Sequence, residues 1–139
     1  MNTGILAGLR VVEASAFVAA PLGGMTLAQL GAEVIRIDLP AGGLDRRRWP
    51  VTGDDVSLFW CGLNKGKRSV CIDFTHPEGR ELAMQLVSAP GPDAGLLLTN
   101  FPPRGCWSYE ALRTRREDLI QLTIQGNRHG GAADRKSVV

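Results

Sequence analysis

LRVVEASAFVAAPLGGMTLAQLGAEVIRID, residues 9–38, predicts a strand, a helix and a second strand in direct succession. The apolar runs at 9–14 and 33–38 have the length and the β-branched content of buried strands. Between them, Pro21 suits a first helical turn and Gly31 suits a helix exit. The apolar face expected for this helix consists of Leu22, Met25, Leu27 and Leu30. The stretch therefore predicts two strands joined by a helical crossover.

Similar signals recur along the rest of the chain. Further strands are predicted at 68–74, 94–100 and 119–124. Helices are predicted at 76–89 and 108–118, and Pro77 lies near the start of the first of them. The residues of that helix expected to face inward are Leu82, Leu86 and Val87. This alternation favours an α/β fold, a Rossmann-like parallel sheet with flanking helices and right-handed crossovers.

Length and composition limit the classes of protein that the chain can represent. Its 139 residues are 44% hydrophobic and carry a net charge of +2, which predicts one globular domain with a genuine core. No apolar run approaches the roughly 18 residues of a membrane span, and the first ten residues lack a signal-peptide pattern. The even charge balance argues against nucleic-acid binding. We therefore expect a cytoplasmic protein without membrane or nucleic-acid partners.

The histidines and cysteines do not form a recognisable metal site. His76 and His129 lack a second ligand at metal-binding spacing, so a surface role is expected for both. The three cysteines, Cys61, Cys71 and Cys106, are odd in number and include no CxxC pair. The sequence therefore predicts neither a bound metal ion nor a disulfide framework.

Candidate ligand-binding residues gather in the polar turns. In parallel α/β sheets, ligands bind beyond the carboxyl ends of the strands, so the turns that follow the predicted strands are the expected site. The turn after the first strand lacks the GxGxxG order, which disfavours a pyridine-nucleotide dehydrogenase. Its apolar residues 17–20 suit packing against an adenine, and core packing is an equal alternative.

Two groups of cations lie in glycine-containing loops. They are Arg46, Arg47 and Arg48 after the second predicted strand, and Lys65, Lys67 and Arg68 before the third. Glycine permits close approach and cations supply charge-assisted hydrogen bonds, which together suit a phosphate group. The alternative is a solvated loop surface whose cations pair with nearby aspartates.

The ordered series of turns resembles one known family. The segments LAGLRVVEASAFVAAPLGGMTLAQLGAEVIRID, GGLDRRRW, NKGKRSVCIDFTHPEGREL and LLLTNFPPRG are similar to the amino-terminal part of the class III coenzyme A transferases. The resemblance covers residues 1–131, which are identified as the amino-terminal, CoA-binding segment of that fold. Residues 132–139 depart from the pattern as a divergent or truncated tail.

The resemblance implies a ligand for these turns. Coenzyme A is expected as part of an acyl-CoA substrate, and not as a resident cofactor. Leu39 and Thr75 occupy positions at which relatives carry a basic residue. The residues that match the family's CoA-binding segments are Phe17, Val18, Ala19, Leu39, Lys65, Lys67, Arg68, Ile72, Thr75, Asn100, Phe101 and Arg104.

The resemblance also implies an activity that needs residues outside this chain. The nucleophilic aspartate of the family is expected beyond Val139, so no catalytic residue is assigned and the chain alone is expected to be inactive. In the implied chemistry, that carboxylate attacks the thioester and forms an enzyme-bound anhydride. The details of the turns favour CoA transfer between the C1 and C4 carboxylates of one mesaconyl unit.

Other activities stay open at the level of the sequence. Intermolecular CoA transfer, acyl-CoA racemisation and non-catalytic binding of CoA or another nucleotide are the alternatives. Members of the family form interlocked homodimers, so the resemblance also implies surfaces that a second copy covers.

Overall fold

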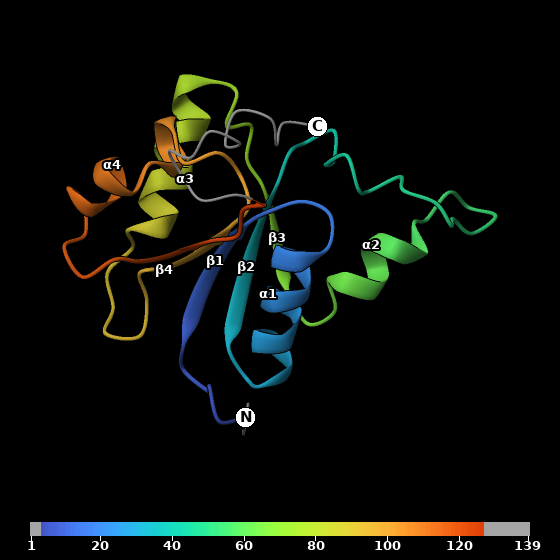
Figure 1. Cartoon of the computed structure of the whole chain (residues 1–139), viewed down its shortest axis with the longest axis horizontal. Helices are drawn as coiled ribbons and strands as arrows, with labels where there is room; N and C mark the ends of the chain where they lie inside the picture. The colour runs from blue at the N-terminus through green and yellow to red at the C-terminus, as the bar shows by residue number, and fades with distance from the viewer. Residues whose placement is uncertain (1–3, 127–139) are drawn as a thin grey trace.

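The computed structural model describes residues 4–126, which form a five-stranded parallel sheet flanked by helices (Figure 1). The strands are β1 (Arg10–Ala14), β2 (Glu33–Asp38), β3 (Arg68–Cys71), β4 (Leu96–Thr99) and β5 (Ile120–Thr123). The helices are α1 (Ala19–Gln29), α2 (Leu58–Leu63), α3 (Pro77–Val87) and α4 (Tyr109–Arg113), with the 3-10 turn η1 (Gly105–Trp107). The strand order β3-β2-β1-β4-β5, with every pairing parallel, confirms the predicted fold class.

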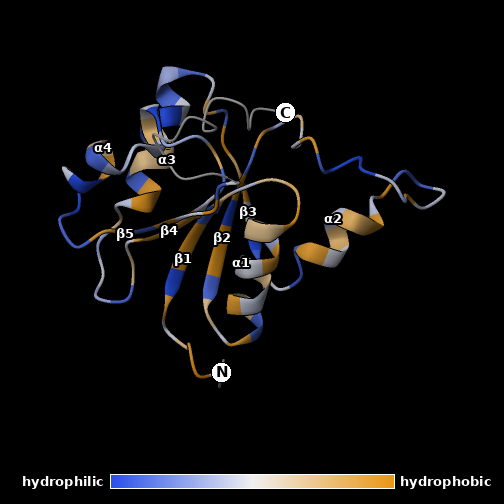
Figure 2. Ribbon diagram, in the orientation of Figure 1, coloured by the Kyte–Doolittle hydropathy of each residue, from blue (hydrophilic) through white to orange (hydrophobic). Residues whose placement is uncertain are grey.

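The sheet has an apolar core on each face. On one face, α1 packs over Val11 and Val34 of the central strands. On the other face, α3, η1 and α4 cover Val12 and Ile37. Because both faces are buried, the apolar residues of the central strands lie in the two cores, while the charged residues Glu13, Arg36 and Asp38 of β1 and β2 are also buried. Figure 2 shows orange, apolar segments along β1 and β2 that are interrupted by blue, charged ones.

The inward face of α1 differs from the predicted one. Its buried residues are Ala20, Pro21 and Gly24, whereas Leu22 and Leu30 are exposed, so the prediction for these two leucines was wrong. The reason is that α1 lies over a charged side chain of β1. A Cβ added at Gly24 would overlap the carboxylate of Glu13, so only a residue without a side chain fits at this position.

The inward face of α3 is partly as predicted. Val87 is buried and Leu86 packs against the same core. Leu82, which was predicted to face inward, is exposed, and Gly79 and Ala83 are buried in its place. These small residues let α3 lie close to the segment that follows β3.

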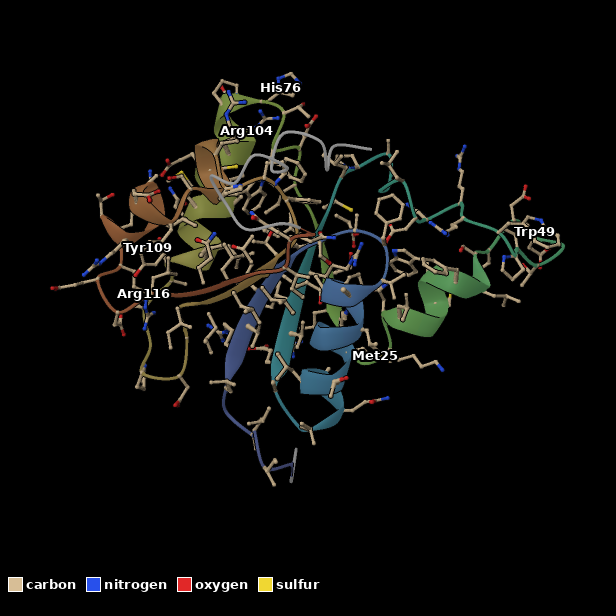
Figure 3. The ribbon with its side chains drawn as sticks, viewed as in Figure 1. Met25, Trp49, His76, Arg104, Tyr109 and Arg116 are labelled. Carbon is tan, nitrogen blue, oxygen red and sulfur yellow. The ribbon has the colours of Figure 1, made fainter. Side chains whose placement is uncertain are left out.

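Residues 39–63, here called the arm, form most of the connection from β2 to β3 and contain a helix, α2, that was not predicted. The arm extends away from the sheet, and Figure 3 shows Trp49 at its far end. Ser57 begins α2 by accepting a hydrogen bond from the Trp60 N–H at 3.1 Å. Leu44 and Trp49 are 80% and 79% exposed, which leaves large apolar side chains on the surface of the arm.

The structure also bears on membrane helices and on metal ligands, but not on the predicted domain boundary. The predicted boundary between residues 131 and 132 lies outside the described residues, as does His129. Between residues 4 and 126, no helix combines the length and the apolar character that crossing a membrane requires. In the same range, no three His, Cys, Asp or Glu side chains gather as ligands for a metal ion.

Candidate functional site

A cavity of about 580 Å³ opens beyond the carboxyl ends of the strands. Its walls come from the last three residues of β2, from the segments that follow β1, β2, β3 and β4, from the start of α3, and from η1. The strand order changes direction at β1, since β2 and β3 lie on one side of it and β4 and β5 on the other. Ligands of doubly wound sheets bind at such a switch point. The cavity also falls within the usual size range of small-molecule sites.

One wall of the cavity is a cluster of three aromatic rings. Phe74 follows β3, Phe101 follows β4, and Trp107 ends η1. Their ring centroids lie 5.8 Å apart for Phe74 and Phe101, 5.3 Å for Phe74 and Trp107, and 5.9 Å for Phe101 and Trp107. These separations are those of aromatic rings in contact. The cluster gives the cavity an apolar side against which a heterocycle can pack.

The turn after β1 is held by side chains from two other segments. The Ala16 N–H donates to Oδ1 of Asn100 at 3.0 Å, and the Asn100 amide donates to the Ala16 carbonyl at 2.7 Å. The Phe17 N–H donates to Oδ2 of Asp45 at 3.1 Å. Phe17 has a φ of 67°, a left-handed conformation that non-glycine residues seldom adopt. The two acceptors fix this conformation and occupy two N–H groups at the edge of the cavity.

The predicted CoA-binding residues fall into two groups. Those that line the cavity are Leu39, Phe101 and Arg104. Those that do not line it are Phe17, Val18, Ala19, Lys65, Lys67, Arg68, Ile72, Thr75 and Asn100. Ser15 and Ala16 line it in place of the three residues that follow them. The turn after β1 therefore meets the cavity slightly earlier in the sequence than predicted.

Several residues of the second group have structural partners. Ile72 is buried in the core on the α3 face of the sheet. The Thr75 N–H donates to Asp73 at 3.0 Å, which closes a tight turn before α3. Asn100 holds the turn after β1, as described above, and so shapes the cavity without lining it.

The cations before β3 lie away from the cavity. Because β3 is parallel to its neighbours, its amino end is at the opposite edge from the carboxyl ends that open into the cavity. Lys65 is exposed, and Nη1 of Arg68 lies 2.9 Å from Oε1 of Glu33. Nζ of Lys67 is internal, with Oδ1 of Asn64 at 2.8 Å. None of the three side chains is among those that line the cavity.

Lys67 belongs to a buried charge cluster between the sheet and α1. The cluster consists of Glu13, Arg36, Asp38, Asp45 and Lys67. The guanidinium of Arg36 lies 3.0 Å from Glu13, 2.9 Å from Asp38 and 3.4 Å from Asp45. Nζ of Lys67 lies 2.9 Å from Oε1 and 2.8 Å from Oε2 of Glu13. Its two cations are thus committed to internal carboxylates.

Burial and neighbouring charges shift the pKa values of the two cations of this cluster in opposite directions. Burial lowers the pKa of the Lys67 ammonium, and the charge of Glu13 and its hydrogen bond only partly oppose that effect. Burial also disfavours the charged form of Arg36. Its hydrogen bond to Asp38 and the three neighbouring carboxylates outweigh that effect, so the pKa of Arg36 is raised above its ordinary value.

Two arginines leave positive charge at the cavity. Arg36, Arg80 and Arg104 all line it, but Arg36 is neutralised by the buried charge cluster. Among the described residues, no carboxylate forms an ion pair with Arg80 or Arg104. Arg80 donates from Nη1 to the Thr75 carbonyl at 2.9 Å, and Figure 3 shows Arg104 at the end of the molecule where α3 begins. The cavity therefore suits an anionic ligand with an apolar part.

Arg80 was not among the predicted CoA-binding residues, although its position in the sequence indicated that it lies near the ligand-binding edge of the sheet. It lies in the first turn of a predicted helix that follows a predicted strand, which is the edge of the sheet where ligands bind. The sequence analysis instead considered the clustered cations of the two glycine-containing loops as phosphate ligands. A single arginine carries no pattern by itself, so its role depends on which segments fold around it.

Comparison with known proteins gives a consistent result. Residues 6–138 match the model of CoA-transferase family III. The chain is 65% identical over 130 residues to the 2-methylfumaryl-CoA isomerase of Chloroflexus aurantiacus, a match that covers 93% of this chain and 32% of that protein. It is 35% identical over 132 residues to the succinate–glutarate CoA-transferase of Agrobacterium fabrum, which covers 87% of this chain and 32% of that protein.

Solved structures agree with these sequence matches. The crystal structure of a CAIB/BAIF family protein from Brucella suis matches with a TM-score of 0.81 at 34% identity, covering 94% of this chain and 36% of that chain. The chain thus spans about a third of the length of the curated relatives that it matches. The family match includes every segment that builds the cavity. The chain belongs to CoA-transferase family III.

Proposed function

We propose that the cavity binds the adenosine end of coenzyme A, as part of an acyl-CoA substrate. The observation that carries this proposal is the position of the cavity at the switch point of the sheet. An aromatic wall and two arginines, neither of which pairs with a carboxylate of residues 4–126, surround the same space. Aromatic rings suit the adenine, and guanidinium groups suit the phosphates. The matched relatives, a CoA isomerase and a CoA-transferase, support a ligand of this class.

Titration calorimetry of the 139-residue chain with CoA is expected to give a dissociation constant in the micromolar range, roughly −8 kcal/mol. Phe101→Ala is expected to weaken binding roughly tenfold, because it removes one ring from the aromatic wall. Tyr109→Ala is the matched control, since Tyr109 is exposed on α4 and does not line the cavity. Circular dichroism verifies that both variants are folded. Absence of CoA binding by the folded wild-type chain would show that the proposal is wrong.

We also propose an activity for the whole protein to which this chain contributes. It moves CoA between the C1 and C4 carboxylates of one mesaconyl unit, without an external acceptor. Identity to the isomerase is 65%, against 35% to the succinate–glutarate CoA-transferase, which favours this reaction over intermolecular transfer. Homodimerisation and a cytoplasmic location belong to the same proposal. The exposed apolar side chains of the arm support a protein partner.

A chimera tests the activity directly. In it, the matched 130 residues of this chain replace the corresponding segment of the Chloroflexus aurantiacus isomerase. The chimera is expected to convert mesaconyl-C1-CoA into mesaconyl-C4-CoA at a rate that does not depend on added free mesaconate. A rate that requires the free acid would favour intermolecular transfer, and a folded but inactive chimera would contradict the proposal. Light scattering of the chimera and cell fractionation test the dimer and the location.

A further inference from the structure

In a doubly wound fold, the N–H groups after the first strand and at the start of the helix that follows usually hold phosphate. Here residues 18–20, at the start of α1, do not line the cavity. The N–H groups of Ala16 and Phe17 already donate to Asn100 and Asp45. A phosphate placed at the Phe17 N–H would have to displace the carboxylate of Asp45, which is buried and also lies near Arg36. The phosphates of a bound nucleotide therefore need donors from another part of the cavity.

Neither the first residue after β2 nor any of residues 72–75, which follow β3, supplies a cation. Leu39 follows β2, and Thr75 lies in the turn that follows β3. The Thr75 hydroxyl donates to Asp73, so its hydrogen is used within the turn. Arg36 faces the cavity but is held by three carboxylates. By elimination, Arg80 and Arg104 are the unpaired cations among the described residues that line the cavity.

Arg80 and Arg104 reach the cavity from adjoining walls. Arg80 lies in the first turn of α3, and Arg104 directly precedes η1, which packs against α3. Burial raises the pKa of the Cys106 thiol in η1, and the charge of Arg80 acts on the same thiol in the opposite direction. The Arg80 guanidinium is thus electrostatically close to η1. Its bond to the Thr75 carbonyl orients it and leaves further N–H donors of the guanidinium for a ligand.

We propose that Arg80, together with Arg104, holds the 3′-phosphate of coenzyme A, so that Arg80 determines specificity for CoA over dephospho-CoA. This inference rests on the proposed function of the cavity. A phosphate monoester carries a charge between about −1.5 and −2 at pH 7, which two guanidinium groups match. Each phosphate of the diphosphate bridge has one ester and one anhydride linkage and carries a single charge, so the 3′-phosphate has the higher charge on one phosphate group. The planar fork of arginine also fits phosphate oxygens in a bidentate manner.

Titration of the 139-residue chain with CoA and with dephospho-CoA tests this inference. The wild-type chain is expected to bind CoA at least tenfold more tightly, because charge-assisted hydrogen bonds to the 3′-phosphate are worth roughly a factor of ten or more. Arg80→Gln is expected to raise the dissociation constant of CoA about tenfold and to change that of dephospho-CoA less than about twofold. Arg80→Lys keeps the charge without the fork, and an intermediate loss is expected.

Arg47→Gln is the matched control for net charge, since Arg47 is exposed and does not line the cavity. It is expected to leave both dissociation constants unchanged. Equal weakening of both ligands by Arg80→Gln would overturn the assignment of the 3′-phosphate. A wild-type chain that binds CoA and dephospho-CoA equally tightly would also overturn the assignment of the 3′-phosphate, but it would be consistent with the proposed binding of CoA in the cavity. A wild-type chain that binds neither ligand would instead overturn the proposed function.

Discussion

Lys67→Met is expected to lower the free energy of unfolding by about 3–5 kcal/mol, the range measured when one partner of a buried ion pair is removed. The Lys67 side chain is 2% exposed, and its Nζ contacts Glu13, Asn64 and the Pro21 carbonyl. Removing it leaves the Glu13 carboxylate buried with less compensating charge. Lys65→Met is expected to change the same free energy by less than about 0.5 kcal/mol, because Lys65 is exposed.

The charge balance of the buried cluster explains why Lys67→Met is expected to lower the free energy of unfolding by so much. Two cations, Arg36 and Lys67, face the three carboxylates of Glu13, Asp38 and Asp45. The cluster already carries one excess negative charge, so Lys67→Met doubles that excess among side chains that are almost fully buried. Adding Glu13→Gln to Lys67→Met leaves one cation facing two carboxylates, which restores the original excess. The double variant is therefore expected to be more stable than Lys67→Met alone.

Urea unfolding followed by circular dichroism measures these differences through the linear dependence of the unfolding free energy on denaturant. Wild type, Lys67→Met, Glu13→Gln and the double variant form a double-mutant cycle, and Lys65→Met is measured beside them as the control. A coupling energy near zero would contradict the cluster as a stabilising unit. So would equal losses in Lys67→Met and Lys65→Met, because the two lysines share a loop and differ in burial.

Much of the fold follows from patterns that the sequence shows directly. The runs predicted as strands overlap β1 to β5. The central strands β1, β2 and β4 are buried, and their apolar residues made them recognisable, whereas the edge strands β3 and β5 are largely exposed and were recognised by their length and β-branched content. The helix α2 escaped prediction because six residues are too few to display a helical period. The exposure of Leu22 and Leu30 was not predictable either, since it depends on a charged residue of β1 that lies beneath α1.

The site was harder to predict than the fold, for a physical reason. Sequence shows which residues carry charge, but it does not show which charges neutralise one another after folding. Lys67 was predicted at a phosphate site, and its ammonium lies against Glu13, 54 positions away in the chain. Arg80 has no such partner among the described residues and lines the cavity. The difference between them arises from packing, and a motif search weighs both cations alike.

Gly79→Ala is expected to lower the free energy of unfolding by about 3 kcal/mol, at the upper end of the usual effect of overpacking. Gly79 is buried in the first turn of α3, and a Cβ added there would overlap the carbonyl oxygen of Asp73. The obstacle is backbone, so no side-chain rotation relieves it. The helix has to move away from the segment that follows β3. Urea unfolding of Gly79→Ala against wild type measures the loss.

Gly23→Ala provides the matched control, because Gly23 is also helical and its added Cβ would lie 3.5 Å from Cδ2 of Leu98, an ordinary contact. Helix propensity alone favours alanine over glycine by roughly 1 kcal/mol, so this variant is expected to be as stable as wild type or more so. Equal stabilisation by both substitutions would show that α3 does not need close approach to the strand. Since Gly79 directly precedes Arg80, displacement of α3 also predicts a reduced preference of Gly79→Ala for CoA over dephospho-CoA. An unchanged preference in a destabilised variant would show that the cavity tolerates movement of this helix.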